Sequence, residues 1–197
     1  MQMKPARAII GLGNPGDQFV DTRHNAGFRV LEVLASRFRQ TFSLDSQLHA
    51  EVALLPSDPP LYILKPQTGM NDSGLTVAAV IAKYDLSLEN VLVVYDDVMM
   101  PMGRLRFQHA GSAGGHHGIE STIAQLGGRV EFSRLKVAVG PDPGGANRFK
   151  FVLAPMEPEN TDLYGRVLAI AADACLTWAN TGVQKAMSAF NGTRLSA

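Results

Sequence analysis

The stretch from Ile9 to Gly27, IIGLGNPGDQFVDTRHNAG, constrains the fold of this chain more than any other part of the sequence. It starts inside the predicted strand 7–12, which carries no polar side chain after Arg7, as expected of a strand buried on both faces of a sheet. A glycine-rich loop and a polar run follow, and they carry Asn14 and His24. Loops at the carboxyl ends of strands are where α/β sheets usually bind ligands. An amide and an imidazole at such a place suit the hydrolysis of an ester or amide better than the binding of a metal ion.

Strands alternate with helices along the rest of the chain. Continuous or alternating apolar residues predict strands, whereas apolar residues three and four positions apart predict helices. The predicted strands are 7–12, 50–55, 61–64, 91–95, 103–108 and 134–139, and the predicted helices are 28–38, 73–84, 119–126 and two pieces between 157 and 190. Residues 140–147 are predicted to form a flexible loop. This alternation, without linkers or repeats, predicts one α/β domain over residues 1–197, built on a twisted, mixed and mostly parallel sheet with helices on both faces.

The polar run before the first predicted helix has an expected geometry of its own. Thr22 or Asn25 is expected to cap the helix over 28–38 with its side chain. His24 would then lie near the positive end of that helix, which disfavours a protonated imidazole. This arrangement predicts a neutral His24.

Charge and cysteine content exclude several classes of protein. The 197 residues include 18 Lys or Arg and 18 Asp or Glu, so overall charge does not attract nucleic acid and any basic surface must be local. Cys175 is the only cysteine, which excludes a disulfide framework within the chain and fits a reducing cytosol. The first residues lack the apolar run of a signal peptide, and no stretch approaches the ~20 apolar residues of a membrane span. We therefore expect a soluble, cytoplasmic protein.

The glycines of the first loop also match a dinucleotide-binding pattern. Gly11, Gly13 and Gly16 have the G-x-G-x-x-G spacing, which is meaningful only when a helix opens directly on the loop. Here a polar segment of about ten residues intervenes, and the acidic residue expected about twenty positions on is missing, since Glu32 lies inside the predicted helix. A nucleotide-dependent oxidoreductase is therefore the weaker alternative, and no cofactor is expected.

Several motifs along the chain, taken in order, resemble one known family. They are GLGNPG followed by TRHNAG, then KPQTGMNDSG, VVYDD, GSAGGHHG and AMSAFN. In this order they resemble the bacterial peptidyl-tRNA hydrolases, which cleave the ester between a stranded peptide and its tRNA. The resemblance covers most of the chain and implies the fold of that family, the same hydrolysis and a monomer.

The resemblance also implies roles for four residues. His24 would be the general base, since an unperturbed imidazole titrates near ~6.5. Asp96 would hold one imidazole tautomer and stabilise the imidazolium as it forms. Asn14 and Asn71 would bind the peptide and the attacked carbonyl through their amides. Because no serine or cysteine stands in a nucleophile elbow, direct attack by water is the simpler mechanism.

Each of these residues also has an ordinary structural explanation. Asparagine beside glycine is common in turns, and a histidine or aspartate at an element boundary is often a cap. Metal binding is not expected, because His109, His116 and His117 have no carboxylate or cysteine at ligand spacing.

The expected partner is peptidyl-tRNA, bound through its acceptor end and its peptide. Lysines and arginines near the last strands would contact phosphates, giving binding that depends on salt and is indifferent to tRNA sequence. Scattered solubilising charge explains any one of these cations equally well. The candidate substrate and tRNA contacts are Phe19, Met70, Gly115, His116, His117, Arg104, Arg106, Lys136, Arg148 and Lys150.

The chain departs from the family pattern at five places. Phe19 stands where the family usually has tyrosine, Gly69 replaces an aromatic residue, His117 replaces asparagine and Met99 replaces a carboxylate. The segment 141–147 lacks the cations often found there. These departures support a second hypothesis, an RNA-binding module without hydrolysis, although the four residues with implied catalytic roles are intact.

Overall fold

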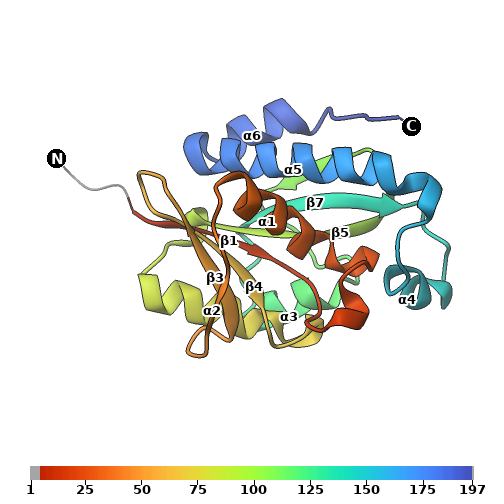
Figure 1. Ribbon diagram of the computed structural model, residues 1–197. Helices are drawn as coiled ribbons and strands as arrows, with labels where there is room; N and C mark the ends of the chain where they lie inside the picture. Colours follow the sequence, from red (N-terminus) through yellow and green to blue (C-terminus); the bar gives the residue numbers. More distant parts are fainter. Residues whose placement is uncertain (1–4, 197) are drawn as a thin grey trace.

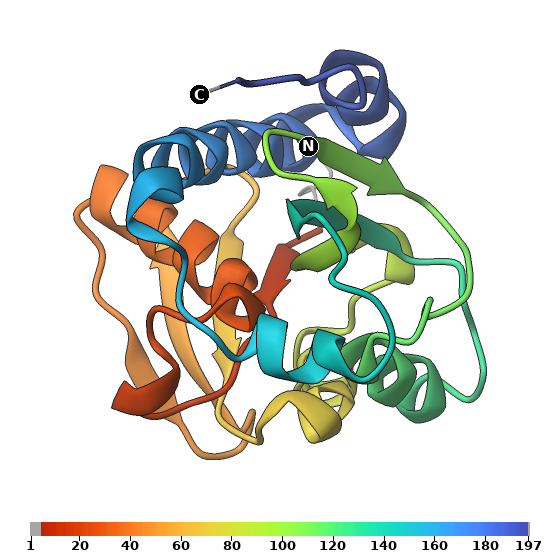
Figure 2. The same cartoon turned by 90° about the vertical axis from the view of Figure 1, so that its right-hand side faces the viewer.

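A computed structural model describes residues 5–196 (Figures 1 and 2). Its centre is a seven-stranded sheet in the order β2-β3-β4-β1-β5-β7-β6. The four central strands β4, β1, β5 and β7 run parallel, whereas β2, β3 and β6 join antiparallel. The strands are β1 Arg7–Gly11, β2 Ser43–Asp45, β3 Ala50–Leu55, β4 Leu61–Pro66, β5 Val91–Pro101, β6 Leu105–Gln108 and β7 Ser133–Gly140.

Helices cover both faces of this sheet. Helices α1, α5 and α6 pack on one face, and α2 and α3 pack on the other (Figure 1). They are α1 Ala26–Arg37, α2 Ser73–Tyr84, α3 His117–Gln125, α4 Asn147–Val152, α5 Thr161–Thr181 and α6 Val183–Phe190. The prediction of a mixed, mostly parallel sheet with helices on both faces is confirmed. None of the helices within residues 5–196 is long and apolar enough to cross a membrane.

The helices on the two faces of the sheet form two hydrophobic cores with it, and these cores explain the continuous apolar runs of the central strands. Successive side chains of a strand point to opposite faces. In β1, Ile9 packs with α1 and α5, whereas Ala8 and Ile10 pack with α2 and α3. In β5, Val94 and Tyr95 divide between the two cores in the same way. Both faces of the central strands are buried, so the side chains on both faces are apolar.

Two glycines allow the first loop to lie directly against α1. A Cβ added to Gly11 would lie 2.4 Å from the carbonyl oxygen of Gly27, and one on Gly27 would lie 2.3 Å from the backbone nitrogen of Leu12. No larger residue fits either place without moving the backbone. Helix α1 begins at Ala26, after two short 3-10 turns, so it does not open on the glycine loop. The dinucleotide-binding alternative therefore lacks the helix it requires.

The structure differs from the predicted elements at β5, β2 and α4. Strand β5 continues to Pro101 instead of ending at 95, because Asp96 and Asp97 still pair with Val137 and Ala138 of β7. The strand β2 and the helix α4 were not predicted, since elements of three and six residues are too short to show a period. Helix α4 begins at Asn147, the last residue of the segment predicted as a loop.

The loop after β6 reaches the carboxyl edge of the parallel strands by an unexpected route. Strand β6 lies at the edge of the sheet and is antiparallel to β7, with Gln108 paired to Arg134 near the start of that strand. The carboxyl end of β6 therefore lies beside the amino-terminal ends of the parallel strands. Residues 109–116 run back along the sheet, and α3 begins at His117.

Candidate active site

A cavity of about 860 Å³ opens at the carboxyl edge of the parallel strands. Figure 2 looks onto this edge, with α4 lying in front of it. The sequence-predicted residues that line the cavity are Asn14, Phe19, His24, Met70, Asn71, Asp96, Arg106, Gly115, His116, His117, Lys136 and Arg148. Arg104 and Lys150 are exposed and stand outside the lining that residues 5–196 form.

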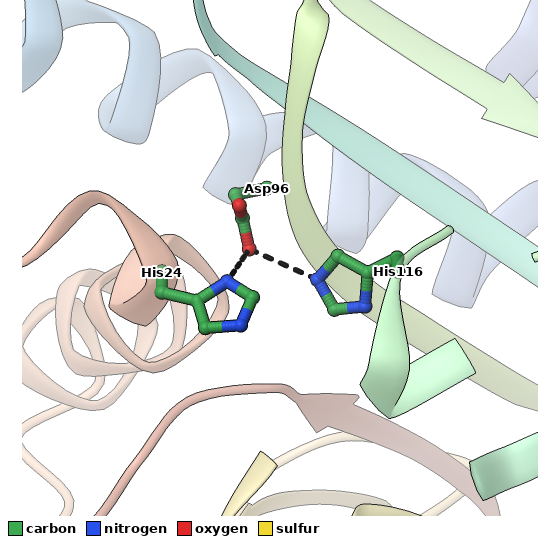
Figure 3. A group of neighbouring side chains, drawn as sticks. All are labelled: His24, Asp96 and His116. Atoms are coloured by element: carbon green, nitrogen blue, oxygen red, sulfur yellow. Dashed lines mark hydrogen bonds and ion pairs between the residues drawn. The ribbon is translucent and has the colours of Figure 1, made fainter. Parts of the chain in front are cut away.

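Two histidines share one oxygen of a buried carboxylate. The Nδ1 atom of His24 lies 2.8 Å from Oδ1 of Asp96, and Nε2 of His116 lies 3.0 Å from the same oxygen (Figure 3). The Asp96 side chain is 2% exposed, whereas those of His24 and His116 are 14% and 10% exposed. The ring of Tyr95 packs edge-on against His116, with centroids 4.8 Å apart.

The two imidazoles keep Asp96 ionised. Burial acts to raise the pKa of Asp96, but the charges and hydrogen bonds of His24 and His116 outweigh burial and hold the pKa well below its usual range. A carboxylate only accepts hydrogen bonds, so both histidines must donate an N–H to it. His24 therefore donates from Nδ1, and when it is neutral its Nε2 carries a lone pair.

The position of His24 at a helix start does not lower its basicity. Burial lowers the pKa of His24, but the charge of Asp96 and the hydrogen bond to it outweigh burial, so the net pKa is raised. The expectation that the helix end disfavours the imidazolium is therefore wrong. A full charge at 2.8 Å acts more strongly than the partial charge of a helix terminus, and His24 lies in the 3-10 turn that precedes α1.

Asn25 fixes Asn14 instead of capping α1. Its Oδ1 accepts a hydrogen bond from the backbone N–H of Asn14 at 2.8 Å, and its Nδ2 donates to the backbone oxygen of Asn14 at 3.0 Å. Asn25 occupies the N-cap position but makes no capping bond, and Thr22 donates to the carbonyl of Phe19. The predicted side-chain cap is thus wrong, because both side chains are used to shape the loop.

The amide of Asn14 is oriented by the opposite wall of the cavity. Its Oδ1 accepts the backbone N–H of Met70 at 2.8 Å. This bond leaves Nδ2 as the free end of the amide, and no residue among 5–196 bonds to it. Asn71 is exposed one residue further on, and its side chain likewise has no hydrogen-bond partner in the described chain. Both amides therefore remain available to a ligand.

Four of the departures from the family pattern line the cavity, namely Phe19, Gly69, Met99 and His117. Gly69 has φ 81°, and a Cβ placed on it would have only Oδ1 of Asn14 within 4 Å, at 3.9 Å. The wall is therefore open at this point. His117 is exposed at the first position of α3 and lines the cavity beside His116.

Two of the predicted tRNA contacts are already paired with carboxylates. Lys136 lies 2.8 Å from Asp97, and Arg148 donates two bonds to Asp142, at 2.8 and 2.6 Å. Ion pairs within residues 5–196 do not engage Arg104, Arg106 or Lys150, which leaves these three as the unneutralised cations of the predicted set.

Sequence reasoning missed the contact between His116 and Asp96. The statement that His116 has no carboxylate at ligand spacing is wrong in three dimensions, since twenty residues of chain separate two groups that lie 3.0 Å apart. It also missed Arg23, which is 1% exposed and donates to the carbonyls of Phe151, Ala154 and Pro155. A buried arginine beside the candidate base was visible in the sequence only as part of the TRHNAG motif.

Comparison with known proteins agrees with this geometry. A family model described as peptidyl-tRNA hydrolase matches residues 8–197. A peptidyl-tRNA hydrolase from Desulfitobacterium hafniense is 42% identical over 94% of this chain and 99% of the relative, and one from Akkermansia muciniphila is 41% identical over 95% and 96%. The crystal structure of peptidyl-tRNA hydrolase from Acinetobacter baumannii matches 98% of both chains with a TM-score of 0.90 and 27% identity. The resemblance drawn from the motifs is confirmed, and the chain belongs to the peptidyl-tRNA hydrolase family.

Proposed function

We propose that this protein hydrolyses the ester bond of peptidyl-tRNA, releasing free tRNA and peptide. The observation that carries the proposal is the His24–Asp96 pair at the floor of a large cavity, with the free amides of Asn14 and Asn71 in its wall. This set supplies a base, a group that orients the base, and donors for a developing negative charge.

The reaction begins with a proton transfer to His24. A water molecule attacks the ester carbonyl carbon while Nε2 of His24 takes its proton, and Asp96 stabilises the imidazolium that forms. The amide donors of Asn14 and Asn71 face the tetrahedral oxyanion. Its collapse breaks the bond to the terminal ribose oxygen, and the imidazolium returns the proton to that oxygen. No step requires a metal ion.

Different parts of the cavity suit the two halves of the substrate. Met99 and Phe149 are exposed apolar side chains in the lining, and we assign them to the peptide. Arg106 lines the same cavity from the edge strand and is assigned to a phosphate. Because peptidyl-tRNA is a product of ribosomes, we place the activity in the cytoplasm, with the protein acting as a monomer.

Turnover separates an enzyme from a module that only binds RNA. The test follows release of labelled acyl-amino acid from an N-acetylated aminoacyl-tRNA, with a chelator present, alongside tRNA binding by the same protein. We expect catalytic turnover in chelator. Binding of tRNA without turnover would instead show that the changes at Gly69 and His117 have left an RNA-binding module.

A further inference from the structure

Three groups that can bind metal ions lie together in the wall of the cavity. The nitrogens of His24 and His116 and a carboxylate oxygen of Asp96 all lie within 4.8 Å of one another. Around a four-coordinate Zn²⁺ with bonds of ~2.0–2.2 Å, ligand atoms lie about 3.3 Å apart. The observed separations of 2.8 and 3.0 Å from Asp96 to the two histidines are a few tenths of an ångström shorter than this, and within the 4.8 Å limit of the cluster the two imidazoles would turn to face a common ion. We propose that His24, Asp96 and His116 bind a divalent transition-metal cation, with Zn²⁺ as the representative ion.

The ligand types select the kind of metal. Two imidazoles with one carboxylate suit Zn²⁺, Co²⁺ or Ni²⁺, whereas Mg²⁺ and Ca²⁺ prefer sites made of oxygen atoms. His24 and His116 both line the cavity, so an ion can enter from solvent and keep a water as its fourth ligand. His49, His109 and His117 belong to no comparable cluster among residues 5–196, and Cys175 is fully buried.

The buried carboxylate adds a second reason for a cation to bind. The Asp96 side chain is 2% exposed, and its Oδ1 accepts hydrogen bonds from both His24 and His116. A buried charge without a counter-charge is costly. A divalent ion would bring positive charge directly to this buried carboxylate, while each neutral imidazole would keep its proton on its other ring nitrogen.

Metal binding and the proposed catalysis exclude one another. When Nδ1 of a neutral imidazole coordinates a metal, the ring proton must reside on Nε2. His24 would then present an N–H to the cavity and could no longer take a proton from water. Occupancy of the site therefore switches hydrolysis off, and removal of the metal restores it. This consequence rests on the proposed function, whereas the binding itself does not.

The binding test uses untagged protein, stripped of metal, with Co²⁺ alone as the probe. We expect the visible absorption of tetrahedral Co²⁺ to saturate at one ion per chain. Added Zn²⁺ should displace the Co²⁺ and remove this absorption. His116→Asn should weaken binding by more than about 100-fold, because even an outer partner of a metal ligand is worth about 10- to 100-fold. The matched control is His117→Asn, the neighbouring histidine outside the cluster, which should bind as the wild type does.

Thermal unfolding keeps this test interpretable. Added Zn²⁺ should raise the Tm of the wild type and of His117→Asn but not that of His116→Asn, whose Tm without metal shows whether it is folded. A wild type without a saturable Co²⁺ spectrum would overturn the proposal. So would a site that survives His116→Asn in a folded protein.

Hydrolysis assays test the consequence separately. Zn²⁺ should inhibit the wild type, and a chelator should restore full turnover. Turnover that rises with added Zn²⁺ would contradict the tautomer argument. Turnover without Co²⁺ binding would overturn the metal site alone, whereas Co²⁺ binding without turnover in chelator would overturn the proposed function alone.

Discussion

One oxygen of Asp96 sets the chemistry of both histidines. Its charge raises the pKa of His24 against the effect of burial, and the hydrogen bond fixes the proton of a neutral ring on Nδ1. A general base is active only when it is unprotonated, so a raised pKa moves the rise in activity toward higher pH. The pH dependence of hydrolysis therefore reports on this one contact.

Replacing Asp96 by asparagine should change both the rate and its pH dependence. For the wild type, kcat/KM should rise with pH around a midpoint above the ordinary imidazole value of ~6.5. In Asp96→Asn the midpoint should fall and the rate should drop by about 1,000-fold or more, since the wrong tautomer is then favoured. Asp97→Asn is the matched control, because Asp97 contacts Lys136 and leaves His24 untouched. An unchanged midpoint in Asp96→Asn would show that another group controls the profile.

The elements position these residues through close backbone packing. Helix α1 lies against the loop after β1 only because residues 11 and 27 have no side chain. That contact places the 3-10 turn of His24 over β5, where Asp96 pairs with β7. The geometry of the pair thus depends on glycine as much as on the two side chains themselves.

Alanine substitutions at two helical glycines test this packing. Gly27→Ala would place its Cβ 2.3 Å from the backbone nitrogen of Leu12, and the overpacking should cost about 1–3 kcal/mol or more of the free energy of unfolding. Gly165→Ala is the matched control in α5, where an added Cβ meets nothing within 4 Å. It should stabilise the protein by about 0.5–1 kcal/mol. Denaturant unfolding measures both, and equal effects would refute the packing argument.

The sequence predicts these elements where a segment is long enough to show the apolar period of a strand or a helix. The limits 50–55 and 73–84 agree with β3 and α2. The predicted strand ends at 95 because a carboxylate normally ends a buried apolar run. In the structure Asp96 stays in β5, because two histidines form hydrogen bonds with its carboxylate. Contacts such as His116 with Asp96 join distant segments and leave no local pattern.

At the scale of the whole molecule, charge is arranged locally. The 18 positive and 18 negative residues cancel, and carboxylates already neutralise Lys136 and Arg148 at the cavity. Arg106 lines the cavity without such a partner among residues 5–196. Affinity for tRNA should therefore depend on a few free cations.

Salt dependence measures the contribution of Arg106. Arg106→Ala should weaken tRNA binding and lower the slope of log K against log salt by about 1, the loss of one phosphate contact. Lys185→Ala makes the same change in net charge on α6, outside the cavity lining, and should leave the slope unchanged. Equal slopes for both variants would show that Arg106 does not contact a tRNA phosphate.

The most direct test of the central claim is turnover of N-acetylated aminoacyl-tRNA by His24→Ala, measured beside its tRNA binding. Loss of the base should reduce kcat by about 100- to 10,000-fold while tRNA affinity stays near that of the wild type. His109→Ala removes an exposed imidazole outside the cavity and serves as the control. Turnover by folded His24→Ala at the wild-type rate would contradict the assignment of His24 as the general base.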